Sequence, residues 1–181
     1  FVVADTVKPT SIEAIAALSV KRGYLLGAGI MSSKRVGINH KHYGVTSTGL
    51  VTFAEIAMRE RGVDIRKDPF SVKLTGGPNG DVAGNGLRLL LDRCPGVQIR
   101  LVVDGTAALV DPAGLDRAEL SRIVLRADAE AFDPARLSPG GFVLHRNARR
   151  TEGLRELFRR VEMTEGGPVE RWVTLDEFHQ E

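Results

Sequence analysis

Apolar residues recur along this chain with two spacings, which predict alternating helices and strands. Spacings of three and four residues predict one helix from Thr10 or Ser11 to Gly23 and a second from Thr46 or Thr48 to Gly62. We expect their apolar residues to face inward: Ile12, Ile15, Ala16, Leu18 and Val20 in the first helix, and Leu50, Phe53, Ile56, Ala57 and Met58 in the second.

A strand, a glycine-rich turn and a helix follow one another from Phe70 to Leu91. Apolar and polar residues alternate up to Leu74, the turn contains three glycines, and helical spacing then resumes. A second apolar run, residues 97–103, ends in Asp104. This order predicts an α/β fold with an at least partly parallel sheet.

The turn at Gly76, Gly77 and Gly80 suits a phosphate, because glycines let the backbone approach closely and a helix N-terminus attracts negative charge. In dinucleotide-binding units an acidic residue roughly 20 positions after the turn bonds the ribose. Asp104 stands at about this distance from Gly80. The turn does not match the usual G-x-G-x-x-G spacing, and Ala83 stands where a third glycine could. The alternative is therefore a turn that binds no ligand.

The second half of the chain contains fewer motifs. Residues 105–110 continue a β-like run, and residues 115–124 predict a helix after a Pro-Gly turn. The charged segment 149–163 is interpreted as a helix with Leu154, Leu157, Phe158 and Val161 facing inward. Residues 169–173 are a strand or a surface segment.

Composition limits the class of protein. The 181 residues, 43% hydrophobic and 27% charged, suffice for one soluble domain or a domain and a piece. Without a long apolar stretch or a signal peptide, no membrane contact is expected and the cytoplasm is the expected location. The net charge of +2, without an arginine-rich arm, gives no support for nucleic acid binding.

Cysteine and histidine do not point to a metal site. Cys94 is the single cysteine, so no internal disulfide and no cysteine-based metal site is possible, and we interpret it as a packing residue at a helix end. His40 and His42 would need further ligands, so no metal is expected. The chain begins at Phe1 rather than Met, which suggests a fragment.

Three motifs, taken in order, resemble one enzyme family. They are KHYGVTSTGL at residues 41–50, KLTGGPNGDVAGN at residues 73–85, and Asp104 followed by DPAGLD at residues 111–116. Together they resemble the NAD-dependent glutamate dehydrogenases, especially the large-subunit type, whose turn reads GGPDGD. The resemblance covers roughly residues 1–125.

The resemblance implies NAD as the cofactor and indicates which residues bind it. Thr46 is similar to the threonine near the nicotinamide, and Asp104 to the acidic residue on the adenosine ribose. The residues similar to the turn over the pyrophosphate are Gly77, Gly80, Asp81 and Val82, with either Pro78 or Asn79 as an inserted residue. A carboxylate at Asp104 would repel a 2′-phosphate, which favours NAD over NADP.

The resemblance also implies substrate and catalytic residues. Lys41 or His42 stands where the family places a basic group near the substrate, and a cation there could pair with a dicarboxylate; a solvated loop is the alternative. Asp5 is similar to the proton-shuttling aspartate of the Pro-Asp motif, although Ala4 replaces the proline. A surface aspartate is the alternative there. The family's catalytic lysine has no counterpart in this chain.

The expected fold is α/β, a partial Rossmann-like NAD-binding domain with flanking helices. Residues 1–45 would close the substrate domain, residues 46–140 would begin the NAD domain, and residues 141–181 would form a helical extension. The implied reaction is oxidative deamination of L-glutamate to 2-oxoglutarate and ammonium, with hydride transfer to NAD, in a homo-oligomer of full-length chains. This piece alone is expected to be inactive. A dehydrogenase of another amino acid and a non-catalytic nucleotide-sensing module are the alternatives.

Overall fold

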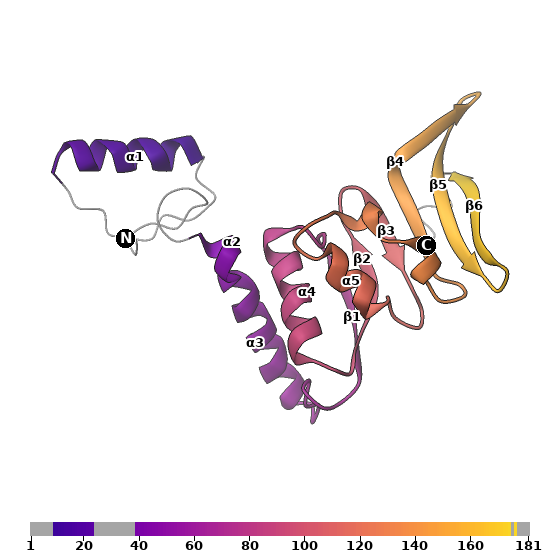
Figure 1. The fold of residues 1–181 in the computed structure, drawn as a ribbon, viewed down its shortest axis with the longest axis horizontal. Coiled ribbons are helices and arrows are strands. Elements are labelled where there is room, and N and C mark those ends of the chain that lie inside the picture. Colours follow the sequence, from indigo (N-terminus) through magenta and orange to yellow (C-terminus); the bar gives the residue numbers. More distant parts are fainter. Residues whose placement is uncertain (1–8, 24–38, 175, 177–181) are drawn as a thin grey trace. The chain divides into compact units, whose positions relative to one another are not determined.

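The computed structural model of the protein describes residues 9–23, 39–174 and 176, and the chain divides into two compact units, residues 1–46 and 47–181. In the first unit, α1 (Pro9–Lys21) confirms the predicted first helix, but Ile15, Leu18 and Val20, which were expected to face inward, are exposed. The helix α2 (His40–Tyr43) forms a single turn where a loop was one interpretation (Figure 1). The predicted loop at residues 27–37 lies outside the described residues.

The second unit contains all the described strands and most of the helices. Its elements are α3 (Val45–Arg59, which begins two residues before the unit), β1 (Phe70–Thr75), α4 (Asp81–Arg93), β2 (Val97–Val103), β3 (Ala107–Val110), α5 (Arg117–Ile123), the 3-10 turns η1 (Ala129–Ala131) and η2 (Pro134–Arg136), β4 (Phe142–Glu152), β5 (Arg155–Thr164) and β6 (Gly167–Thr174).

Within the described residues, six strands form one mixed sheet in the order β1-β2-β3-β4-β5-β6. The strands β1 and β2 are parallel, with Val72 opposite Ile99, and every later pair is antiparallel. The crossover between the parallel strands is α4, as a β-α-β unit requires. The predicted α/β class and partly parallel sheet are confirmed.

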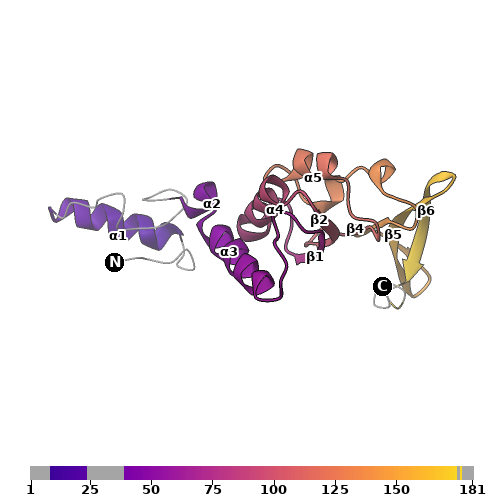
Figure 2. The same ribbon diagram turned by 90° about the horizontal axis from the view of Figure 1, so that it is seen from below.

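Helices α4 and α5 pack against the sheet and form the main core (Figure 2). Leu87 and Leu120 from these helices are fully buried with Ile99 and Leu109 from the strands. Cys94 is buried where α4 ends, which agrees with its interpretation as a helix-end packing residue. Leu91, Cys94 and Val97 offer their carbonyl oxygens to the Arg117 guanidinium near that helix end, as expected for a cation at a helix C-terminus.

The predicted inward face of α3 is wrong except at Met58, which packs against the core. Leu50, Phe53 and Ile56 are exposed, Phe53 by 75%, whereas Ser47 and Val51 are buried. Apolar residues on this helix occupy more than one face, so spacing alone did not identify the face that packs. Contact with the core through Val51 decides it.

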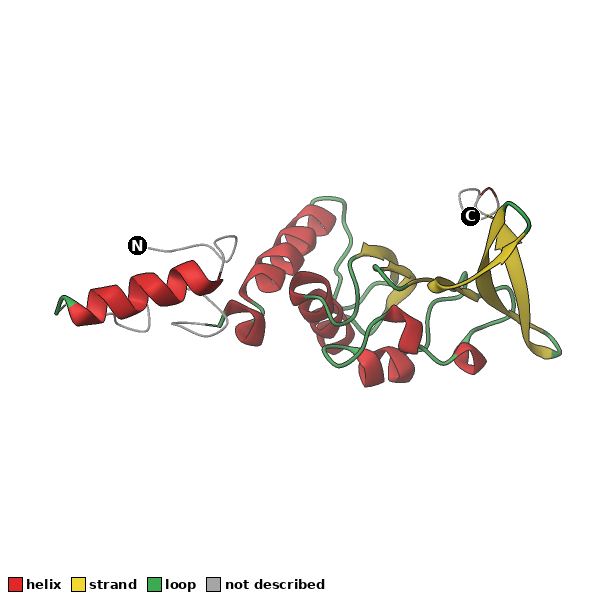
Figure 3. Cartoon of the chain, turned by 90° about the horizontal axis from the view of Figure 1, so that it is seen from above, coloured by secondary structure: helices red, strands yellow, loops and turns green. Residues whose placement is uncertain are grey.

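The helical interpretation of residues 149–163, and of the C-terminal extension as helical, is wrong. These residues form parts of β4 and β5, which with β6 make an antiparallel three-stranded arm, residues 142–174 (Figure 3). Gly153 and Gly167, with φ of 62° and 114°, adopt left-handed conformations where the chain reverses. Within β4, only residues 142–145 pair with β3, so the rest of the arm extends beyond β3.

Among the described residues, no helix has the length and apolar character needed to cross a membrane.

Candidate functional site

The turn between β1 and α4 is built from glycines with specific conformations. Gly76 has φ of 114°, and its N–H donates to the Val103 carbonyl oxygen at 2.7 Å. Gly80 is the N-cap of α4 in an extended conformation, and among the described residues its helix has no side-chain cap. The first turn of a helix leaves backbone N–H groups without helical partners, so this end of α4 is suited to an anion.

Asp104 lies directly against this turn. A Cβ added to Gly77 would come within 2.5 Å of Asp104 Oδ2, so the close approach requires glycine at this position. The turn and the carboxylate meet because the parallel strands β1 and β2 end at the same edge of the sheet. The structure therefore brings together Gly77, Gly80, Asp81, Val82 and Asp104, five of the predicted cofactor residues.

The Asp104 carboxylate also organises the chain around it. Its Oδ1 accepts from the N–H and the hydroxyl of Thr106, each at 2.7 Å, and from the N–H of Ala107 at 3.1 Å. Its Oδ2 accepts from the N–H of Ala129 at 2.7 Å. The carboxylate thus ties the end of β2 to η1, a role that the sequence did not suggest.

The hydrogen bonds decide the charge of Asp104. Partial burial by itself would raise the pKa of this carboxyl, but the bonds from Thr106, Ala129 and Ala107 outweigh burial, and the pKa is lowered. The group is ionised at neutral pH. A carboxylate oxygen can accept at least two hydrogen bonds, so Oδ2, with one bond from Ala129, retains capacity for a ligand hydroxyl.

Two residues outside the predicted set hold the turn from the other side. The N–H of Leu125 donates to the Pro78 carbonyl oxygen at 2.9 Å, and Leu125 has a φ of 60°, in the left-handed region. A Cβ on Gly84, in the second turn of α4, would collide with that carbonyl oxygen and lie 2.8 Å from Leu125 Cδ2. The third glycine that close packing requires is therefore Gly84, one residue after Ala83. The sequence signal for this position was a further glycine after Gly77 and Gly80.

The same end of the sheet also holds a buried histidine. His145 pairs with Ala107 across β3 and β4, and burial, followed by the charge of Arg159, lowers its pKa. Its Nε2 atom has no hydrogen-bond partner among the described residues. His145 is therefore neutral at physiological pH, and no local pattern distinguished it from a surface histidine.

The remaining predicted residues belong to the first unit, residues 1–46. Lys41 and His42 lie in α2, where the His42 N–H donates to Asn39 Oδ1 at 3.1 Å and its ring packs edge-on against Tyr43. Thr46 is an exposed residue at the start of α3. Asp5 lies outside the described residues.

No group of three or more histidine, cysteine, aspartate or glutamate side chains that could hold a metal ion occurs in the described part of the chain.

A parallel β-α-β unit whose glycine turn meets an aspartate at the end of the second strand is an arrangement that nucleotide-binding domains use. Comparison with known sequences gives the family. The chain belongs to the family described as bacterial NAD-glutamate dehydrogenase, catalytic domain, which matches residues 1–167.

Curated relatives carry related names. The chain is 30% identical over 153 residues to an NAD-specific glutamate dehydrogenase of Pseudomonas aeruginosa, covering 82% of this chain and 9% of the relative. It is 34% identical over 113 residues to glutamate dehydrogenase 2 of Dictyostelium discoideum, covering 61% and 10%. The chain thus spans about a tenth of the length of these relatives. No solved structure gives a significant match.

Proposed function

We propose that this chain is part of an NAD-dependent glutamate dehydrogenase and that β1, α4 and β2 form the first Rossmann-like unit of its NAD-binding domain. The observation that carries the proposal is the contact of the Gly77 backbone with the Asp104 carboxylate. Membership of the family and the names of the relatives support the same function. The reaction is the oxidative deamination of L-glutamate to 2-oxoglutarate and ammonium.

The residues at the turn fit the pyrophosphate of NAD. Gly77 and Gly80 carry no side chain that would keep a phosphate from the backbone, and the N-terminus of α4 has favourable dipole direction. Asp81 places a carboxylate in the first helical turn, which repels a phosphate, so its contribution and that of Val82 come from backbone N–H groups. When bound, NAD supplies the acceptor for a hydride from the substrate.

Asp104 accounts for the choice of NAD over NADP. Its ionised carboxylate can accept a hydrogen bond from the adenosine ribose through Oδ2, beside Gly77. A 2′-phosphate in the same place would meet a negative charge at close range, which disfavours NADP.

The substrate residues are proposed from the family resemblance. Lys41 or His42 would pair with a carboxylate of glutamate, Thr46 would contact the nicotinamide end of the cofactor, and Asp5 would move protons during loss of ammonia. Catalysis by the full-length protein would require further residues from outside this chain, including a lysine.

A matched pair of glycine substitutions tests the cofactor site by calorimetric titration of the chain with NAD and NADP. In Gly80→Ala, the new methyl would lie 3.1 Å from the Gly77 carbonyl oxygen and 3.7 Å from its nitrogen, which crowds the backbone that a phosphate approaches. Gly86→Ala is the control, because no atom lies within 4 Å of its added Cβ.

We expect NAD to bind at least tenfold more tightly than NADP, and Gly80→Ala to weaken NAD binding at least tenfold, about 1.4 kcal/mol. Gly86→Ala should bind NAD as the parent chain does. Equal binding of NAD by both variants would show that the turn does not hold the cofactor. Equal binding of NAD and NADP would contradict the proposal that Asp104 selects NAD.

A further inference from the structure

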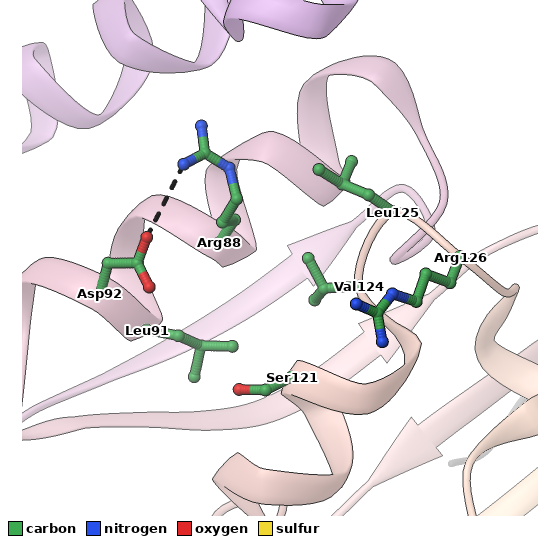
Figure 4. Close-up of a pocket in the computed structure, with 7 residues that line it drawn as sticks. All are labelled: Arg88, Leu91, Asp92, Ser121, Val124, Leu125 and Arg126. Atoms are coloured by element: carbon green, nitrogen blue, oxygen red, sulfur yellow. Dashed lines mark ion pairs between the residues drawn. The ribbon is translucent and has the colours of Figure 1, made fainter.

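A cavity of about 370 Å³ lies between α4 and the end of α5 with the loop that follows it (Figure 4). Its volume is within the range of roughly 300–1,000 Å³ that small-molecule sites occupy. The side chains around it are Arg88, Leu91, Asp92, Ser121, Val124, Leu125 and Arg126. None of the glycines or Asp104 of the proposed cofactor site is among these residues.

The cavity has a positive charge available for a ligand. Arg126 forms no ion pair or hydrogen bond with its side chain among the residues that the structure describes. Arg88 pairs with Asp92 at 3.7 Å, and both side chains are exposed, so this ion pair is weak and easily exchanged. Two guanidinium groups and one carboxylate leave a net charge of one positive unit around the cavity.

The other side of the cavity is apolar. Leu91, Val124 and Leu125 present aliphatic side chains to the cavity, which the Arg126 side chain also lines (Figure 4). The Ser121 hydroxyl donates to the Arg117 carbonyl oxygen at 2.8 Å, so toward the cavity its oxygen acts as an acceptor. A ligand that uses the guanidinium groups and the aliphatic side chains needs one anionic group and an apolar body.

We propose that this cavity binds a small organic anion. A carboxylate or phosphate group pairs with Arg126 and is approached by Arg88, and the apolar body packs against Leu91, Val124 and Leu125. A guanidinium group suits both anions because its planar donors match two of their oxygens.

Leu125 connects this cavity to the glycine turn. Its side chain lines the cavity, while its N–H holds the Pro78 carbonyl oxygen and its Cδ2 atom faces Gly84. A ligand that contacts Leu125 therefore acts on the residue that fixes the turn. This coupling needs no bound NAD, so it can be observed on the chain alone.

The proposal is tested by NMR titration of the 15N-labelled chain with phenyl phosphate and with benzoate. Benzyl alcohol has the apolar ring without the charge, and inorganic phosphate has the charge without the ring. We expect either organic anion to bind at least tenfold more tightly than both of these probes, with the tighter of the two identifying the preferred anionic group. The amide signals of residues 121–126 should shift, together with those of Gly77 and Gly80.

Charge variants locate the site. Arg126→Gln should weaken binding of the organic anion at least tenfold, and Arg88→Gln should weaken it about threefold, providing a second variant if the first does not fold. Arg93→Gln, which removes an exposed arginine of the same helix outside the cavity, should leave affinity unchanged. Equal affinity of Arg126→Gln and the parent chain, or tight binding of benzyl alcohol, would overturn the anion site. Binding without a shift at Gly77 and Gly80 would overturn the coupling.

Discussion

At the glycine turn, three backbone N–H groups and a hydroxyl converge on the Asp104 carboxylate, whereas in the arm charged side chains pair across strands at the surface. Both regions belong to one sheet. At the turn, the Asp104 carboxylate binds the neighbouring Thr106 and also Ala129, which lies 25 residues further along the chain. In the arm, pairs such as Arg159 and Glu170 connect residues that the strand register already places as diagonal neighbours on adjacent strands.

This difference shows where the fold is sensitive to substitution. Glu119 resembles Asp104, because it accepts from the Asp133 N–H at 2.8 Å and from the Arg122 guanidinium at 2.6 Å. Removing an acceptor of this kind leaves partly buried donors without partners. Removing one charge from an exposed pair returns its partner to water at little cost.

The largest effect is expected where the turn is most closely packed. Gly84→Ala would press a methyl group against the Pro78 carbonyl oxygen and Leu125, and we expect it to lower the free energy of unfolding by about 3 kcal/mol. Gly86→Ala on the same helix should raise it by about 0.5 to 1 kcal/mol, since the added methyl has space and alanine favours the helix. Urea unfolding followed by circular dichroism measures both, and a Gly84→Ala variant as stable as Gly86→Ala would contradict the close packing.

An intermediate effect is expected from the carboxylates, and it depends on pH. Asp104→Asn should cost about 2 kcal/mol at pH 7, because an amide group cannot accept all the hydrogen bonds of the carboxylate. The pKa of Asp104 is lowered as described above, and that of Glu119 is lowered mainly by the Arg122 hydrogen bond.

For both groups the folded-state pKa lies below the unfolded value of about 4, so their stabilisation is complete above that pH and is lost as the pH falls through the folded values. The unfolding free energy of Asp104→Asn and of Glu119→Gln should accordingly fall less between pH 7 and pH 3 than that of the parent chain. Asp128→Asn changes an exposed aspartate and is the control. Identical acid sensitivity in all four chains would exclude the carboxylates as its source.

The smallest effect is expected in the arm. Arg159 Nε and Glu170 Oε2 are 2.7 Å apart, with side chains 38% and 46% exposed. A double-mutant cycle of Arg159→Ala and Glu170→Ala should give a coupling of about 0.5 kcal/mol that weakens in high salt. A salt-independent coupling several times larger would mean that the arm is held in the same way as the turn.

Several parts of this molecule were predictable from local pattern. The β1-α4-β2 order followed from alternation, glycines and helical spacing, and the approach of Asp104 to the turn followed from the rule that parallel strands end at one edge. The arm was mistaken for a helix because Leu154, Leu157, Phe158 and Val161 have helical spacing. Strand pairing, which acts between distant residues, overrides that preference.

The sequence by itself determined the class of fold, the glycine-rich turn and the family resemblance, because these depend on residues close to one another along the chain. Only the tertiary structure decided that Asp104 also holds Ala129, that Leu125 and Gly84 fix the turn, and that Val51 rather than Phe53 is buried. Each of these depends on contacts between segments far apart in sequence, whose geometry no local spacing encodes.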